Sequence, residues 1–207
     1  KVYSATGGDA PGDKEGFKGD GAGAWRQPGR VRLTSPGGIN VINKIRSVID
    51  RTQHPAGTKL KVFFLCSVAG GTGSGTIVDL VYMTRHVLET IFAGLYNNTR
   101  IFGYIFSPSA CEGGINEERN PGANHYAAMK EIAYLMRLHD RGEKIKMNYG
   151  ITNVTFNRNI FDTCMIVDGN TPAFGGFRKP AETARNVVVQ SILGSMTARD
   201  VVGDEQV

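Results

Sequence analysis

The feature that most constrains this chain is a glycine-rich run placed between an apolar stretch and a segment with helical spacing. The run is Ala69-Gly70-Gly71-Thr72-Gly73-Ser74-Gly75, and the apolar stretch Leu60 to Leu65 comes shortly before it. Apolar residues then recur at helical spacing, at Ile77, Val81, Leu88, Ile91 and Leu95. The pattern predicts a buried strand, a tight turn and a helix.

A turn of this composition is suited to binding a phosphate group. Its four glycines, Gly70, Gly71, Gly73 and Gly75, carry no side chains that would keep a bulky anion from the backbone. Thr72 and Ser74 add hydroxyl donors. The first N–H groups of the following helix have no partner within it, and the positive end of the helix dipole lies behind them. We therefore expect an anion site here, although a glycine-rich surface turn without a ligand is the simpler alternative.

The run does not match either of the two common nucleotide fingerprints. A P-loop needs a lysine before its closing serine or threonine, and Gly75-Thr76 has none. The dinucleotide fingerprint is Gly-x-Gly-x-x-Gly, whereas Gly71, Gly73 and Gly75 are spaced as Gly-x-Gly-x-Gly. An oxidoreductase that binds a dinucleotide is kept only as a minor alternative.

Residues 69–75 resemble the signature loop of the tubulin/FtsZ superfamily, in which this loop wraps the phosphates of a guanine nucleotide. The surrounding residues resemble the bacterial tubulin-like proteins more than tubulin or FtsZ themselves. The resemblance implies an α/β fold: a parallel-sheet, Rossmann-like, three-layer nucleotide-binding domain. It also implies GTP or GDP with Mg²⁺ as the bound cofactors.

Periodicity along the chain independently predicts an α/β fold. Helical spacing covers 36–51, the segment from the glycine run to about 95, 124–141 and 181–197, and apolar runs predict strands at 60–68, 100–106 and 161–167. Loops are expected at 1–30, 109–122 and 172–180. The inward residues of the 124–141 helix are expected to be Tyr126, Met129, Ala133, Met136 and Leu138. Such alternation produces a parallel sheet covered on both faces, with ligands beyond the carboxyl ends of the strands.

We divide the chain into a flexible glycine-rich segment at 1–20, a GTP-binding domain at 21–200 and a tail at 201–207. By the resemblance, the domain is expected to be partial, without the family's first strand and C-terminal domain. The chain begins at Lys1 rather than at a methionine, which also suggests a fragment.

Other segments resemble the loops that complete the family's nucleotide site. Ala22, Gly23 and Ala24 match the loop that senses the terminal phosphate. Arg30, which follows that loop, has two alternatives: it pairs with phosphate or with a carboxylate in the core. Pro108 begins a loop that resembles the ribose-side loop, and Glu117 is our candidate for the ribose hydroxyls, with Glu112 and Glu118 as open alternatives.

The resemblance to the family also implies which residues contact guanine. Asn170 follows the third predicted strand, where the family has an asparagine that contacts guanine, and Asp168 competes for that assignment. Asn186 lies in the last predicted helix, at the place of an asparagine that reads the guanine edge. An amide offers a donor and an acceptor side by side, which suits a purine. No catalytic residue is assigned, because the family's catalytic acidic loop acts on a neighbouring subunit and is not found in this chain.

Composition limits the partners and the compartment. The net charge of +5 is dispersed, so it suits a nucleotide or an acidic partner and does not indicate nucleic acid. Three separated cysteines, Cys66, Cys111 and Cys164, predict neither a disulfide framework nor a metal site. This cysteine usage and the lack of a long apolar segment predict a cytoplasmic protein with no membrane segment.

We therefore interpret the chain as the GTP-binding domain of a tubulin/FtsZ-like cytoskeletal GTPase. The resemblance implies head-to-tail self-association into filaments, adaptor proteins as further partners, and hydrolysis completed at the subunit interface. This segment alone is expected to hydrolyse GTP weakly or not at all. The alternative is a nucleotide-binding scaffold, or a partner-binding protein, that has the fold but does not polymerise.

Overall fold

The computed structural model describes residues 26–34, 37–51, 59–111, 121–149, 153–169 and 180–197. The helices are α1 (Arg26–Thr34), α2 (Gly37–Arg51), α3 (Gly71–Ile91), α4 (Ala93–Tyr96), the 3₁₀ helix η2 (Pro108–Ala110), α5 (Pro121–Leu135) and α6 (Pro180–Thr197). The strands are β1 (Leu60–Ser67), β2 (Thr99–Phe106), β3 (Ile145–Asn148), β4 (Asn153–Phe156) and β5 (Thr163–Val167).

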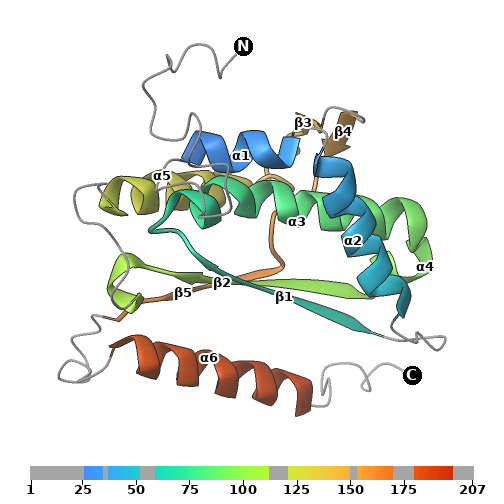
Figure 1. Cartoon of the computed structure of the whole chain (residues 1–207). Coiled ribbons are helices and arrows are strands. Elements are labelled where there is room, and N and C mark those ends of the chain that lie inside the picture. The colour runs from blue at the N-terminus through green and yellow to red at the C-terminus, as the bar shows by residue number, and fades with distance from the viewer. Residues whose placement is uncertain are drawn as a thin grey trace.

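The centre of the fold is a parallel sheet with the strand order β1-β2-β5. Leu60 pairs with Thr99 at the start of β1 and β2, and Phe106 pairs with Val167 at the ends of β2 and β5. Helices α3 and α5, with α1 and α2 beside them, lie on one face of the sheet, and α6 lies on the other (Figure 1). The predicted three-layer α/β fold with a parallel sheet is confirmed.

The main core lies between the sheet and α3. Ile77, Val81 and Leu88 of α3 are buried against Ile101 and Ile105 of β2. These α3 residues follow the spacing expected from the sequence. Ile91, which continues that spacing, is 42% exposed because α3 ends there and the chain turns into α4.

Two predictions made for the N-terminal half and the fifth helix are wrong. Residues 26–30 are helical in α1, although Pro28-Gly29 favoured a loop. Proline is tolerated in the first turn of a helix, where N–H groups have no helical partner, and packing of α1 on α3 supplies the remaining stability.

In α5, Tyr126 is 64% exposed and Ala133 is also exposed. The buried stripe of α5 is Ala128, Ile132 and Leu135, while the predicted Met129 and Met136 are partly buried against the core and Leu138 is fully buried just after the helix.

The antiparallel hairpin β3–β4 was not predicted from the sequence. Ile145 pairs with Phe156, and Asn148 pairs with Asn153. Each strand has only four residues, so the alternation of polar and apolar residues is too short to be distinctive. The hairpin is stabilised by burial of Val154 and Phe156 in the core beside Tyr82.

Candidate functional site

The carboxyl ends of the three parallel strands meet at one edge of the sheet, on the left in Figure 1, together with the first turns of α3 and α6. The segments are joined there by main-chain hydrogen bonds. The N–H of Val68 donates to the carbonyl of Phe106, and the N–H of Ser107 donates to the carbonyl of Val167. The edge predicted to hold the ligand is therefore a connected surface.

Helix α3 begins at this edge without a side-chain cap. Gly70 is its N-cap residue, in an extended conformation with φ −94° and ψ 168°. The N–H and the hydroxyl of Ser74 both donate to the carbonyl of Gly70, at 3.3 and 2.5 Å. Since Ser74 is also buried, its hydroxyl serves the helix and does not face a ligand, whereas the Thr72 side chain is exposed. The main-chain N–H groups of the first turn, at Gly71, Thr72 and Gly73, have no partner within the helix and are the donors that this turn offers.

The glycines of the run differ in what would surround a side chain at each position. A Cβ atom at Gly73 would lie 2.0 Å from the carbonyl oxygen of Ser67, and one at Gly75 would lie 2.3 Å from that of Arg26. These two glycines permit close packing of the backbone. A Cβ at Gly70 would meet nothing within 4 Å. The open side of the run is therefore at Gly70.

Helix α5 is attached to the same run by Asn124. Its side-chain amide donates to the carbonyl of Ala69 at 3.2 Å, so the first turn of α5 lies beside the first turn of α3. The neighbouring His125 has a buried Nδ1 atom with no hydrogen-bond partner among the described residues. Sequence reasoning did not assign Asn124 a role, because its contact joins segments that are distant in the chain.

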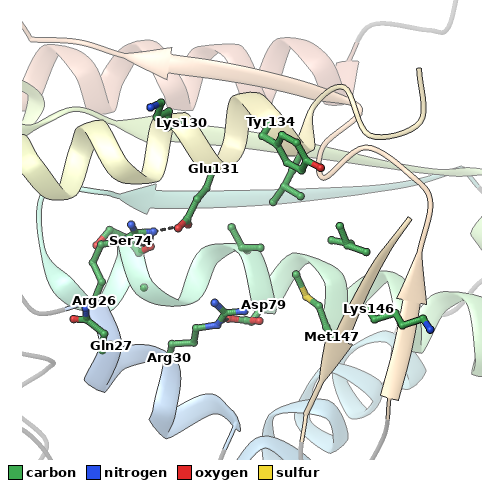
Figure 2. Close-up of a pocket in the computed structure, with 14 residues that line it drawn as sticks. Arg26, Gln27, Arg30, Ser74, Asp79, Lys130, Glu131, Tyr134, Lys146 and Met147 are labelled. Carbon is green, nitrogen blue, oxygen red and sulfur yellow. Dashed lines mark hydrogen bonds and ion pairs between the residues drawn. The ribbon is translucent and has the colours of Figure 1, made fainter. Parts of the chain in front are cut away.

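Sequence reasoning also missed Arg26, which contacts the first turn of α3. Its Nε and Nη2 atoms donate to the carbonyl of Ser74 at 3.2 and 3.0 Å. The same guanidinium forms an ion pair with Glu131 of α5 at 2.5 Å (Figure 2). One residue at the start of α1 therefore links α3 and α5.

One turn further along α1, Arg30 pairs with a buried carboxylate. Its Nε atom lies 3.2 Å from Oδ2 of Asp79, whose side chain is 2% exposed. Burial raises the pKa of Asp79, and the positive charge of Arg30 opposes that rise. The second oxygen, Oδ1, has no hydrogen-bond partner within the described part of the chain. Of the two alternatives for Arg30, pairing with a core carboxylate is confirmed.

Asp168 connects the end of β5 to the loop after β2. Its Oδ1 atom accepts hydrogen bonds from the hydroxyls of Ser107 (3.0 Å) and Ser109. The Ser109 hydroxyl in turn accepts from the N–H of Gly169 at 3.1 Å. These bonds tie one carboxylate oxygen of Asp168 to the loop after β2.

Of the other residues predicted for the nucleotide site, two lie in the described part of the chain and the rest lie outside it. Pro108 begins η2 at the ligand edge. Asn186 is exposed on α6, between the buried residues Ala184 and Val188, and α6 packs against η2. Ala22, Gly23, Ala24, Glu117 and Asn170 lie outside the described residues.

The described residues provide neither a metal centre nor a membrane-spanning helix. They contain no cluster of three or more histidine, cysteine or acidic residues that could hold a metal ion. No helix in this set is long and apolar enough to cross a membrane. Burial raises the pKa of the Cys66 thiol to about 12, so this cysteine packs rather than reacts.

Comparisons with known proteins agree with this geometry. No curated protein matches the chain. A comparison with protein families matches residues 11–204 to the family described as tubulin-like. The match includes the glycine run, the parallel sheet and all the described helices, so this chain belongs to the tubulin-like family.

Proposed function

We propose that this domain binds GTP and GDP at the first turn of α3. The observation that carries the proposal is the uncapped start of α3 at the ligand edge of a tubulin-like chain, with open space at Gly70. An uncapped helix start offers N–H donors and a favourable dipole to a phosphate. The residues present fit such a group, since Gly70 places no side-chain cap on the first N–H groups of α3 and the Ser74 hydroxyl donates to the Gly70 carbonyl.

The phosphates would be held by main-chain N–H groups of Ala69–Gly75 and by the Thr72 hydroxyl. Ala22, Gly23 and Ala24 are proposed to contact the terminal phosphate. Pro108 and Glu117 are proposed for the ribose side, and Asn170 and Asn186 for guanine. Mg²⁺ would be bound through the phosphates and water, as is usual for this ion, rather than by a protein cage.

The full protein is proposed to form head-to-tail filaments in the cytoplasm, with the nucleotide at the junction. A heterologous contact that does not close into a ring propagates into a filament. Hydrolysis would be completed by an acidic group of the neighbouring subunit that activates water against the terminal phosphate. This chain alone is therefore proposed to turn over GTP slowly or not at all.

The experiment that tests binding is a thermal-shift series with GTP, ATP and NAD on the wild type and on two variants. Gly70→Asp and Gly70→Asn both suit an extended N-cap position, so both are expected to fold. Only the aspartate places a negative charge where the phosphate would lie. A ligand at 100 times its Kd stabilises the native state by about 2.7 kcal/mol, which is readily measured.

GTP is expected to raise the Tm of the wild type and of Gly70→Asn, with no rise for Gly70→Asp. Equal GTP shifts for the two variants would show that the phosphate lies elsewhere. A larger response to NAD than to GTP would instead support the dinucleotide alternative.

Filament formation requires a separate test on the full-length protein. Light scattering and negative-stain microscopy are expected to show filaments with GTP and none with Gly70→Asp. GTP binding without any assembly would support the scaffold alternative.

A further inference from the structure

Two carbonyl oxygens at the start of α3 would repel a phosphate if they faced it, and both are bound by hydrogen-bond donors. The Gly70 carbonyl accepts from the N–H and the hydroxyl of Ser74, within the same turn. The Ala69 carbonyl accepts from the side-chain amide of Asn124, which belongs to α5, at 3.2 Å. Since Ala69 is only 1% exposed, water has little access to this carbonyl, and its hydrogen bond depends on Asn124.

The contact with Asn124 sets the orientation of the peptide group between Ala69 and Gly70. This peptide bond is trans, so its carbonyl and its N–H point in opposite directions. Because Asn124 holds the Ala69 carbonyl toward α5, the N–H of Gly70 is directed away from α5. Rotation of the peptide group by half a turn would exchange the two, and would put an acceptor where the donor now lies.

Glycine at position 70 makes such a rotation easy. The φ angle of Gly70 is −94°, which any residue can adopt. The rotation would carry φ into the positive region, which glycine adopts readily and residues with a Cβ atom adopt only at a cost. The glycine run by itself therefore does not fix the direction of this N–H, and the contact that does fix it comes from a residue 55 positions further along the chain.

Helix α5 is held in place by contacts other than that of Asn124. Arg26 donates to the Ser74 carbonyl of α3 and forms an ion pair with Glu131 of α5. Ala128, Ile132 and Leu135 of α5 are buried in the fold. Loss of the Asn124 amide is therefore expected to leave α5 beside α3 and to affect chiefly the peptide group that it contacts.

We propose that Asn124 is a positioning residue of the phosphate site, which keeps the peptide group of Ala69 and Gly70 in the orientation that presents the Gly70 N–H to a phosphate. The inference rests on the proposed binding of GTP at the start of α3. Asn124 acts through the main chain and has no need to touch the nucleotide. The apparent affinity for GTP then falls in proportion to the fraction of molecules that hold the competent orientation.

The test measures the Kd for GTP by calorimetry in the wild type, in Asn124→Leu and in a matched control. Leucine is close to asparagine in size and has no donor. Asn159→Leu is the control, because the Asn159 amide oxygen accepts from the N–H of His139 at 2.9 Å, ahead of the first residue of β5. We expect GTP binding to weaken about fivefold or more in Asn124→Leu and to be unchanged in Asn159→Leu. Asn124→Ala is the second variant and is expected to show the same loss; far-UV circular dichroism verifies folding of each.

A second arm repeats the Asn124→Leu change in a Gly70→Ala background. A Cβ at Gly70 meets nothing within 4 Å, and alanine accepts the observed φ but resists the rotated one. The orientation is then held without Asn124, so in this background Asn124→Leu is expected to weaken GTP binding by less than about twofold. Comparing the two losses cancels any effect of Gly70→Ala itself. A general loosening of α5 would instead reduce affinity equally in both backgrounds.

Wild-type affinity in both Asn124→Leu and Asn124→Ala would overturn this inference and leave the proposed function standing. Equal losses in the Gly70 and Gly70→Ala backgrounds would also overturn it, because the effect of Asn124 would then not pass through the orientation of the peptide group. Absence of GTP binding to the wild type would overturn the proposed function and this inference with it, so the two failures are distinguishable.

Discussion

Arg30 of α1 and Asp79 of α3 form an ion pair in which one partner is buried and the other is largely in solvent. The Nε–Oδ2 distance is 3.2 Å, and the side chains are 58% and 2% exposed, respectively. The pair joins α1 to the centre of the longest helix. Among the described residues, Arg30 is the positive charge that pairs with Asp79, so the burial of this carboxylate depends on Arg30.

Arg30→Gln is expected to destabilise the fold by about 2 kcal/mol, since it leaves a buried carboxylate uncompensated. The expected loss is below the roughly 3–5 kcal/mol of a fully buried pair, because Arg30 is more than half exposed. Urea denaturation measures the change, and Arg46→Gln on the exposed side of α2 is the matched control. Adding Asp79→Asn to Arg30→Gln is expected to recover most of the loss. If the double variant is no more stable than Arg30→Gln, the pair is not the cause.

Asp79→Asn by itself is expected to stabilise the protein at neutral pH, by of order 1 kcal/mol. Burial raises the pKa of Asp79 in the folded state above its ordinary value of 3.8, so the folded protein holds this proton more tightly than the unfolded chain does. The stability that this bound proton gives the wild-type protein is fully present below the pKa of Asp79 in the unfolded chain. It is lost as the pH rises through the pKa of Asp79 in the folded protein.

The advantage of Asp79→Asn should therefore be largest at neutral pH and should shrink as the pH falls through the raised folded pKa of Asp79 toward its ordinary value of 3.8, where the folded protein holds the proton. Urea denaturation of both proteins between pH 4 and 8 measures the difference. An advantage that is constant over this range would contradict the assigned ionisation.

The glycines of residues 69–75 are expected to separate into two groups. Gly73→Ala and Gly75→Ala should each cost about 2 kcal/mol or more, because the new Cβ would meet a backbone carbonyl oxygen at 2.0 or 2.3 Å. Gly70→Ala meets open space and should change stability by less than about 0.5 kcal/mol. Chemical denaturation of the three variants tests this; similar losses at all three positions would mean that the run is packed throughout.

Asn186→Asp is expected to weaken GTP binding without changing the fold, because a carboxylate cannot donate a hydrogen bond to the guanine carbonyl. Asn186 is exposed on α6, and Gln190 is also exposed one turn later. Gln190→Glu adds the same charge to the same helix and serves as the control. We expect about a tenfold loss of GTP affinity in Asn186→Asp alone, by calorimetry. Unchanged affinity would remove Asn186 from the guanine site.

Local patterns in the sequence were sufficient for the fold class and for the edge at which the carboxyl ends of the parallel strands meet. An apolar run, four glycines and a helical repeat all lie within residues 60–95. Each specifies its strand, turn or helix through interactions between residues that are close in the chain. The parallel sheet followed from alternation of strands and helices. The family assignment followed from the glycine run, which the comparison confirmed.

The sequence alone determined that a strand, a glycine turn and a helix adjoin, because backbone conformation and apolar periodicity depend on neighbouring residues. Only the tertiary structure decided that Pro28-Gly29 lies in a helix, that Gly73 and Gly75 are needed for packing, and that Arg30 faces Asp79. Each of these depends on a partner far along the chain. Contacts of that kind are set by how the elements pack, and no local pattern encodes them.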